Sequence, residues 1–418
     1  MKKFLISSAL LSTIINASNI TNEDLTSELE SAKVSTSKTA NSGFMPSISL
    51  IVDMSYSKES LDVDTSHVEI PGLMSGGGDE GELVGNDGFN LNYAELAIGA
   101  SVDTYFNLMS IFHLTKDSFE IEEAYVTTSS LPFNLKAKIG KFKSDFGYLN
   151  NKHHHSYNFA DKPLIYMAFL GEEGLNDEGV QLQYVLPTPF YMMAGFEAFQ
   201  GLVEPSFGYQ GFGGIVEDTK YPSLFVGYIK SSFDIAGGTL LAGVSMAKGD
   251  AKLNNLENED TAEAFDGETT LYGIDLTYKK YFSSNHSLSL SGEYLYREMI
   301  GDRIIPIVGG FNRFDLEKNQ GGFYSEIVYQ YDKNIRAGLR YSAITQNDVF
   351  INGIDRDIED DISVTSAMLE YNPSEYSRIR LQYNHNASLY NEDGTINNKN
   401  DITLQFNYSI GAHGAHSF

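Results

Sequence analysis

The amino-acid sequence predicts an all-β protein, a transmembrane antiparallel β-barrel of about 16 strands, and three observations lead to this prediction. Apolar and polar residues alternate with a period of two in segment after segment. The connections between these segments alternate between short and long. The 418-residue chain has 26 tyrosines and 26 phenylalanines but neither cysteine nor tryptophan. Strict alternation indicates strands whose two faces meet different environments, and closure of the sheet satisfies every backbone group without disulfides.

The chain begins with features of a secretory signal peptide. Lys2 and Lys3 precede an apolar run from Phe4 to Ile15, and Ala17 supplies the small residue of a cleavage site. This run is too short to span a bilayer as a helix. We therefore expect a signal peptide over residues 1–17, a short periplasmic segment over 18–46 and the barrel over 47–418. The formal net charge of −27 argues against nucleic acid as a partner.

Sixteen segments have the alternation and the length, about 9–11 residues, of membrane-spanning strands. In the last of them, Ile402, Leu404 and Phe406 alternate with Thr403 and Gln405. The expected strands are 47–57, 89–102, 105–115, 119–130, 134–145, 178–186, 189–201, 222–231, 238–249, 269–282, 286–298, 321–332, 334–347, 363–373, 376–390 and 400–411. An even number suits a closed barrel, and tyrosines near the strand ends suit an interfacial girdle. A water-soluble sandwich with an apolar core is the alternative explanation of the alternation.

Short turns alternate with connections that are mostly long, acidic and glycine-rich, except at 116–118 and 391–399, which is the pattern of outer-membrane barrels. The topology resembles that of the general porins over nearly the whole mature chain. In those proteins the connection between strands 5 and 6, here 146–177, folds into the barrel and narrows the pore. Its many apolar residues need a wall to pack on. The expected constriction-loop residues are Tyr157, Phe159, Asp161, Lys162, Glu172 and Glu173.

The chain also resembles a family of barrels labelled zinc-regulated TonB-dependent outer membrane receptors. The matching stretches are "GFNLNYAELAIGA", "IEEAYVTTSSLP", "GKFKSDFGYLN", "HHHSYNFADKPL", "GLNDEGVQLQYVLPTPFY" and "GAHGAHSF". The resemblance implies zinc-linked, energy-coupled uptake. Plugged receptors of that kind have about 22 strands. Here only about 29 residues, Ser18 to Pro46, precede the first expected strand, which is too few for a plug domain, so we expect a porin-like architecture.

Three of the nine histidines, His153, His154 and His155, lie together in the expected constriction loop. Consecutive side chains of an extended chain point apart, so all three cannot comfortably bind one tetrahedral ion. Two of them with Asp161 or with another loop could hold zinc. Otherwise they line the pore as neutral imidazoles or form a solvated loop tip.

If the apolar faces contact lipid, the alternate side chains line the lumen, where charges avoid the cost of facing lipid. Gly140 is expected to mark a bulge that changes the inward phase. The expected pore-lining residues are Lys136, Lys138, Lys141, Lys143, Glu122, Glu123, Arg336, Arg340, Arg378, Arg380, Glu326 and Glu370. These charges either pair and solvate a water-filled lumen or create a transverse field between the arginines and the carboxylates of the loop.

Acidic residues gather in segments 58–88, 250–268 and 355–361. They make either a solubilising surface or low-affinity sites for Ca²⁺ or Mg²⁺. They would concentrate cations, whereas the basic rows of the lumen favour anions, so the sequence leaves ion preference open.

The expected function is a porin for passive diffusion of small hydrophilic solutes or ions, without a resident cofactor, surrounded by outer-membrane lipid. The resemblance to general porins implies a homotrimer. The alternative is a selective uptake channel for a metal ion or complex, or for an anion. A barrel enzyme or an adhesin is a further class. For an enzyme the nearest candidate is His385, beside Asn384 and Asn386, and we expect no catalytic site.

Overall fold

The computed structural model describes residues 46–60, 87–116, 118–212, 214–256, 262–356, 358, 362–390 and 396–411. The expected signal peptide, nearly all of the expected periplasmic segment, the acidic residues 61–86 and the last seven residues lie outside this described part. The expectations for those segments therefore stay predictions.

Nearly all regular structure in the described residues is β-strand. The strands are β1 (Ser47–Glu59), β2 (Gly88–Ser101), β3 (Phe106–Leu114), β4 (Phe119–Thr128), β5 (Leu135–Lys143), β6 (Asn176–Val185), β7 (Tyr191–Phe199), β8 (Leu224–Ile235), β9 (Gly238–Asn255), β10 (Glu263–Ser283), β11 (His286–Ile307), β12 (Gly310–Gln330), β13 (Ile335–Ile351), β14 (Ile354–Asp355), β15 (Ile362–Ser374), β16 (Ser377–Tyr390) and β17 (Ile396–Gly411). Each of the sixteen expected segments coincides with one of them, and β14 is a two-residue addition that pairs with β13.

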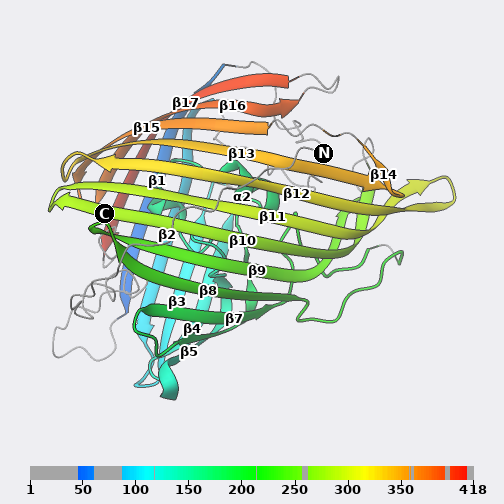
Figure 1. Cartoon of the computed structure of the whole chain (residues 1–418), viewed down its shortest axis with the longest axis horizontal. Helices are drawn as coiled ribbons and strands as arrows, with labels where there is room; N and C mark the ends of the chain where they lie inside the picture. Colours follow the sequence, from blue (N-terminus) through cyan, green and yellow to red (C-terminus); the bar gives the residue numbers. More distant parts are fainter. Residues whose placement is uncertain are drawn as a thin grey trace.

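The strands form one closed antiparallel barrel (Figure 1). Closure comes from β1, which pairs with β2 on one side and with β17 on the other. Neighbours in sequence pair throughout the ring, except that β13 also pairs directly with β15 across the short β14. The predicted barrel of about 16 strands is confirmed.

Five strands on one side, β9 to β13, are 17–22 residues long and extend well beyond a membrane's thickness. Residues 299–320 were expected to form a long loop, and this expectation is wrong. Instead β11 and β12 stay paired until Ile307 lies opposite Gly310, leaving a two-residue turn at Val308 and Gly309. Much of 250–268 is likewise strand, because β9 and β10 stay paired from Asn255 and Glu263 inward. The backbone satisfies its own hydrogen bonds in a ladder whether lipid or water surrounds it.

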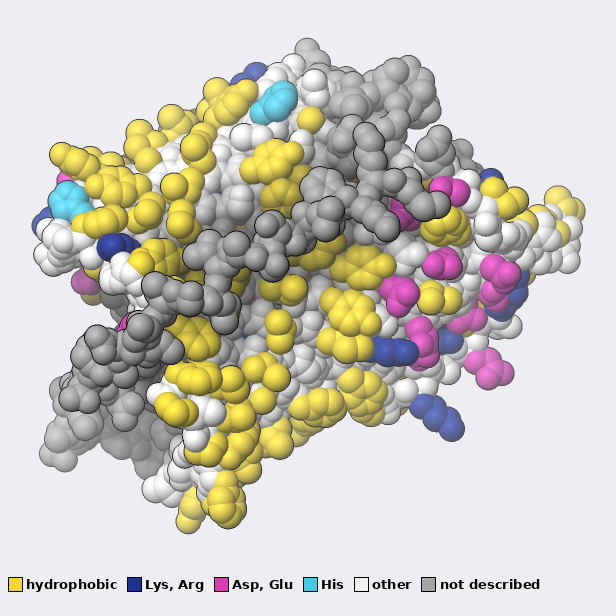
Figure 2. Space-filling model, viewed as in Figure 1, with side chains coloured by type: hydrophobic (Ala, Val, Ile, Leu, Met, Phe, Trp, Pro, Cys, Tyr) yellow, Lys and Arg dark blue, Asp and Glu magenta, His cyan; other side chains and the backbone are white. Residues whose placement is uncertain are grey.

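The outward face of the barrel is apolar over its middle band, as Figure 2 shows for the visible side. Ile139, Ile274 and Leu339 are each more than half exposed, and the residues that alternate with them are mainly polar and buried. A soluble sandwich would hide its apolar face in a core, so this arrangement favours contact with lipid over the soluble alternative.

The lumen is occupied by the connection between β5 and β6. Residues 144–175 fold inward and contain the short 3-10 helix η3 (His154–Ser156) and the helix α2 (Leu164–Leu170), and a further turn, η2 (Pro132–Asn134), precedes β5. Six of the seven α2 side chains are buried, and the helix packs on β12 and β13 (Figure 1). No helix in the described residues is long and apolar enough to cross a membrane. The predicted in-folded third loop is confirmed, and we call residues 144–175 the constriction loop.

A charge placed on the outward face should destabilise the barrel only within the lipid band. We expect Ile274→Arg, at the middle of β10, to lower the free energy of unfolding in lipid vesicles by about 2–4 kcal/mol. The matched control is Val308→Arg at the exposed hairpin turn, which should change it by less than about 0.5 kcal/mol. Equal losses in both variants, measured by urea unfolding, would contradict the assignment of the lipid face.

Candidate functional site

One wall of the lumen carries a cluster of three arginines around a single carboxylate. Glu370 on β15 lies opposite Arg336 of β13 and Arg380 of β16 in the strand register. Arg336 Nη1 donates to Glu370 Oε1 at 3.0 Å, and Arg380 Nη2 donates to Glu370 Oε2 at 2.7 Å. Arg378 Nε lies 3.9 Å from the same oxygen. The glutamate is therefore surrounded by positive charge, and its own side chain is fully buried.

Arg378 and Arg380 have N–H donors that Glu370 does not accept, and these donate to the backbone of the constriction loop. Arg378 Nη1 donates to the carbonyl oxygen of His155 at 2.8 Å. Arg380 Nη2 donates to that of Tyr157 at 2.7 Å. Charged donors to carbonyl oxygens make strong hydrogen bonds when both partners are buried. The wall thereby fixes the path of residues 155–157.

Two loop side chains continue this attachment. The Asn158 amide donates to Glu326 Oε2 at 3.0 Å and accepts from Arg336 at 2.7 Å. Asp161 forms an ion pair with Arg340 and accepts from the Gln382 and Asn384 amides. The Arg340 guanidinium also lies over the Phe159 ring, 4.6 Å from its centroid. We call the contacts of residues 155–161 with β12, β13, β15 and β16 the polar latch.

The polar latch covers the residues that the sequence places on the pore wall. Arg340 is 2% exposed and Arg380 0%, so neither faces open solvent. Their charges are matched within the protein by Glu370 and Asp161. Of the two hypotheses for the lumenal charges, paired charges or a transverse field between arginines and loop carboxylates, pairing describes this wall better.

A second polar anchor of the loop is Glu293, a lumenal glutamate whose contacts with the loop were not predicted from the sequence. Glu293 of β11 accepts from the backbone N–H groups of Tyr148 and Leu149, each at 2.9 Å. It also accepts from the hydroxyls of Tyr166 and Tyr324, at 2.8 and 2.7 Å. Four donors to one buried carboxylate satisfy it without a counter-ion. No local signal marks it, since its partners are distant in sequence.

Of the four lysines of β5 that were expected to face inward, Lys141 departs from the expected phase. Lys138 lies beside the buried Phe142, 4.7 Å from its ring centroid, and this alternation places Lys136 on the same side. The expected change of phase after Gly140 is not seen: Lys141 alternates with Phe142 on the outer side, where its Nζ donates to the Ile121 carbonyl at 2.8 Å. Lys143, where the strand ends, turns inward again and is buried.

The irregularity lies instead in β4, next to Gly140. The register between β3 and β4 shifts so that Glu122 is the extra residue, and both Glu122 and Glu123 are buried. Gly140 has φ 135°, and a Cβ there would lie 2.1 Å from the Ala124 carbonyl oxygen. The glycine was a sign of an irregular strand pair, but the sequence could not say which partner carries the extra residue.

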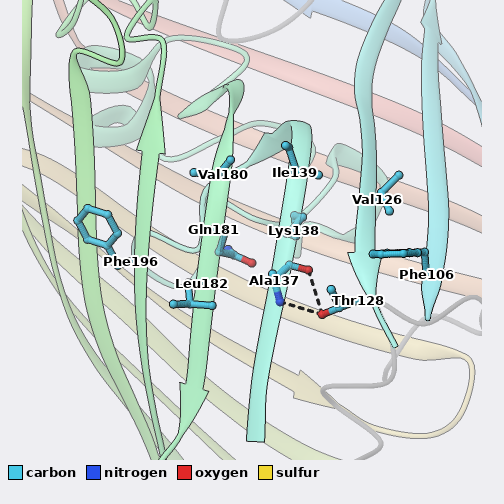
Figure 3. Close-up of a pocket in the computed structure, with 10 residues that line it drawn as sticks. All are labelled: Phe106, Val126, Thr128, Ala137, Lys138, Ile139, Val180, Gln181, Leu182 and Phe196. Carbon is cyan, nitrogen blue, oxygen red and sulfur yellow. Dashed lines mark hydrogen bonds between the residues drawn. The ribbon is translucent and has the colours of Figure 1, made fainter. Parts of the chain in front are cut away.

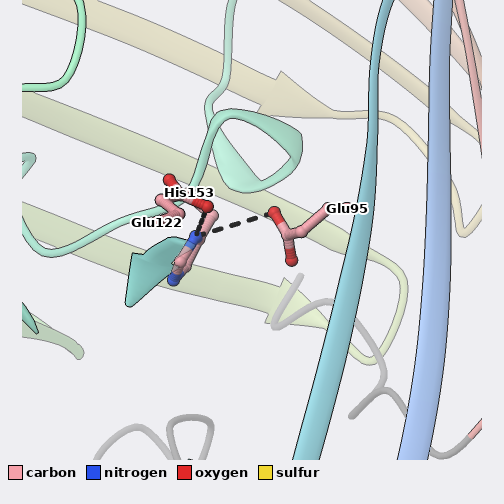
Figure 4. A group of neighbouring side chains, drawn as sticks. All are labelled: Glu95, Glu122 and His153. Atoms are coloured by element: carbon pink, nitrogen blue, oxygen red, sulfur yellow. Dashed lines mark hydrogen bonds and ion pairs between the residues drawn. The ribbon is translucent and has the colours of Figure 1, made fainter. Parts of the chain in front are cut away.

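His153 of the histidine tract faces this bulge (Figure 4). His153 Nδ1 lies 3.3 Å from Glu122 Oε2 and 3.6 Å from Glu95 Oε2, and its Nε2 lies 3.1 Å from Glu123 Oε2. His155 Nδ1 lies 3.1 Å from Glu95 Oε2. Burial lowers the pKa of His153, but the Glu122 and Glu95 carboxylates outweigh burial and hold that pKa well above its usual value.

The remaining loop residues are not part of this group. His154 turns toward Tyr93 and His113 instead, and burial with nearby Lys162 and Lys143 holds its pKa well below the usual value. Lys162 is buried too, and burial with repulsion from Lys143 lowers its pKa to about 7. Glu172 and Glu173 are exposed. Asp161, expected as a metal ligand beside the histidines, lies in the polar latch.

Two further features, a groove between strands and His385, lie on the outward face of the barrel and form no site in the lumen. The groove in Figure 3 is lined by Ile139, Val180, Leu182 and Phe196, all strongly exposed on the outward face, so lipid is its natural environment. His385 alternates with buried neighbours on the outward side and contacts Asn400 at 2.8 Å. It meets no nucleophile among its described contacts.

Comparison with known proteins finds one close relative and many structures of the same fold. A protein of Aquifex aeolicus (strain VF5), itself described as uncharacterized, is 44% identical over 384 residues, covering 90% of this chain and 80% of that protein. No family model matches. The resemblance to zinc-regulated TonB-dependent receptors therefore stays a prediction.

Similar solved structures are outer-membrane barrels. An anion-selective porin from Comamonas acidovorans has a TM-score of 0.52 and 13% identity, covering 88% of this chain and all of that one. The outer membrane channel DcaP of Acinetobacter baumannii has a TM-score of 0.51 and 14% identity, covering 89% and 99%. The chain thus has the fold of outer-membrane porins, and this fold with its apolar outward face places it in an outer membrane.

Removing the central carboxylate of the arginine cluster should be costly. We expect Glu370→Gln to lower the free energy of unfolding by about 3–5 kcal/mol, because two buried guanidinium groups, Arg378 and Arg380, and the partly buried Arg336 lose their counter-charge. The control Glu268→Gln breaks only an exposed pair with Lys248 and should cost less than about 1 kcal/mol. Equal costs in denaturant titrations would show that Glu370 is not buried as described.

Proposed function

The chain belongs to the same family as the Aquifex aeolicus relative, and we propose that it is a porin through which small hydrophilic solutes or ions diffuse passively. In this proposal the constriction loop sets the width of the path. A structure of OmpT from Vibrio cholerae described as a trimer form has the same fold, with a TM-score of 0.50 and 11% identity over 88% of this chain and all of that one, and a homotrimer is likewise proposed here.

The observation that carries the proposal is how the loop is attached. Residues 155–161 are held by ionic and amide contacts to one wall, whereas residues 164–170 of the same loop pack in an apolar cluster. Polar groups along the path replace the hydration shell of a passing solute, as in other selective pores. In this proposal a segment held in this way narrows the lumen.

Cations are the preferred ions in this proposal. The wall arginines are engaged by Glu370, Asp161 and loop carbonyl groups, whereas the outer mouth has an excess of carboxylates. The described parts of 248–268, 298–318 and 348–356, at the far ends of β9 to β13, carry ten Asp and Glu against six Lys and Arg. Figure 2 shows many of them gathered at one end of the molecule. A mouth with net negative charge raises the local concentration of cations.

Loosening the polar latch should widen the path. We expect Arg340→Gln and Asp161→Asn each to raise single-channel conductance in planar bilayers about twofold or more over wild type, with more frequent fluctuations, because the loop loses a buried ion pair. The double variant should add little to either single change, since both remove the same contact.

The control for this experiment is Arg313→Gln, which breaks ion pairs on the outer extension and leaves the latch intact, so it should not produce the twofold rise in conductance. A wild-type barrel that conducts nothing while folded would overturn the porin proposal. If conductance is unchanged in both latch variants, the proposal that the polar latch sets the width of the path is wrong.

The reversal potential under a potassium chloride gradient tests ion preference. We expect the wild type to favour potassium, and the pair Glu268→Gln with Asp302→Asn to reduce that preference. The pair Lys248→Gln with Arg313→Gln neutralises the partners of those carboxylates and should increase it. A chloride preference in the wild type, or the same shift in both pairs, is the outcome that contradicts the proposal.

A further inference from the structure

We propose that Glu95, Glu122 and His153 form a binding site for a divalent transition-metal ion inside the barrel. Glu95 comes from β2, Glu122 from the bulge in β4 and His153 from the constriction loop (Figure 4). Their ligand atoms all lie within 4.8 Å of one another. The inference goes beyond the porin function, because binding does not depend on whether the barrel conducts.

The distances suit direct coordination. An ion about 2.0–2.2 Å from each ligand in tetrahedral geometry separates neighbouring ligand atoms by about 3.3–3.6 Å. His153 Nδ1 lies 3.3 Å from Glu122 Oε2 and 3.6 Å from Glu95 Oε2. The ligand atoms of Glu95 and Glu122 lie within 4.8 Å of each other, so binding one ion draws these two carboxylates together around it. Three protein ligands leave a fourth position open for water, which suits an ion that exchanges.

The residues that hydrogen-bond to the three proposed ligands are also of the kind found around metal sites. With Nδ1 on the ion, the Nε2–H of His153 donates to Glu123 Oε2, 3.1 Å away. A carboxylate behind a ligating histidine fixes its tautomer and ring orientation and increases its basicity. His155 Nδ1, 3.1 Å from Glu95 Oε2, holds that carboxylate in the same manner. These contacts exist because the bulge turns two consecutive glutamates inward.

The charge and hydrogen bonding of the surroundings favour a cation independently. Glu95, Glu122 and Glu123 are buried, and the one lysine paired with them is Lys143, 3.0 Å from Glu122. With the two imidazoles neutral, as a metal ligand and its neighbour would be, three carboxylates against one ammonium leave two negative charges for a divalent ion to match. In addition, the buried Tyr93 hydroxyl, two residues before Glu95 on the same face, has no hydrogen-bond partner among the described residues. Such a group normally meets water or an ion.

The donor set selects the class of ion. An imidazole with two carboxylates suits zinc and related transition metals, whereas calcium and magnesium prefer oxygen ligands alone and higher coordination numbers. An ion here would also join the loop to two strands that the polar latch does not reach. The loop would then be attached to the barrel on both sides.

The experiment is zinc binding by the refolded full chain, measured by isothermal titration calorimetry in detergent. All variants carry His413→Asn and His416→Asn, so that these two imidazoles near the chain end do not contribute. We expect one ion per chain, a loss of at least 100-fold in affinity for His153→Asn, and a loss of about 10–100-fold for Glu123→Gln. The control His154→Asn removes the adjacent imidazole and should leave affinity unchanged.

Cobalt in place of zinc gives a second measurement on the protein with native ligands. A four-coordinate ion should produce strong visible absorption, which a surface-bound octahedral ion lacks. Absence of a one-to-one site, equal losses for His153→Asn and His154→Asn, or calcium binding as tight as zinc would each overturn the proposal. Heat-modifiable gel mobility checks that each variant is folded, and Glu122→Gln offers an independent change on the strand side of the site.

Discussion

The pairing of buried charge between the wall and the constriction loop is the constraint on which the lumen depends. A single buried arginine or carboxylate without a partner costs several kcal/mol, so the charges on β12 to β16 must be matched. Glu370 matches part of the arginine charge, and Asp161 with the carbonyl groups of His155 and Tyr157 completes it. The loop therefore supplies counter-charge and hydrogen-bond acceptors that the wall arginines need, and the positions of these arginines determine where the loop lies.

The fold was largely predictable because each spanning strand repeats one physical rule. Lipid outside and polar contacts inside impose a period of two, and sixteen segments could be located from that period alone. The extension of β11 and β12 to the hairpin turn at Val308 could not be located from this period. Outside the membrane both faces of a strand meet water or neighbouring residues, so the alternation of apolar and polar residues weakens. Lys141 was misplaced for a related reason: one extra residue in β4 changes the phase locally, and only pairing reveals it.

The histidines that the constriction loop contributes to the candidate site could be predicted from the sequence. The glutamates that β2 and β4 contribute could not. The histidine tract is visible in the sequence, and consecutive side chains were expected to diverge, as His154 does from its two neighbours. The carboxylates that meet His153 come from β2 and β4, distant in sequence, and no local pattern links Glu95 to Glu122. Asp161 was the natural guess by proximity along the chain, yet the buried Arg340 is the stronger partner for it.

The two halves of the loop are held by forces of different kinds, and this decides which half a change of charge affects. Residues 164–170 bury Ile165, Phe169 and Leu170 in an apolar cluster with the inner wall, a contact that depends weakly on pH and salt. Residues 153–161 are held by charges and amides, whose strength depends on what else is bound nearby. A substitution that changes these charges therefore acts on residues 153–161, between the polar latch on one side and the glutamates that face His153 on the other. The packing of helix α2 in its apolar cluster does not depend on them.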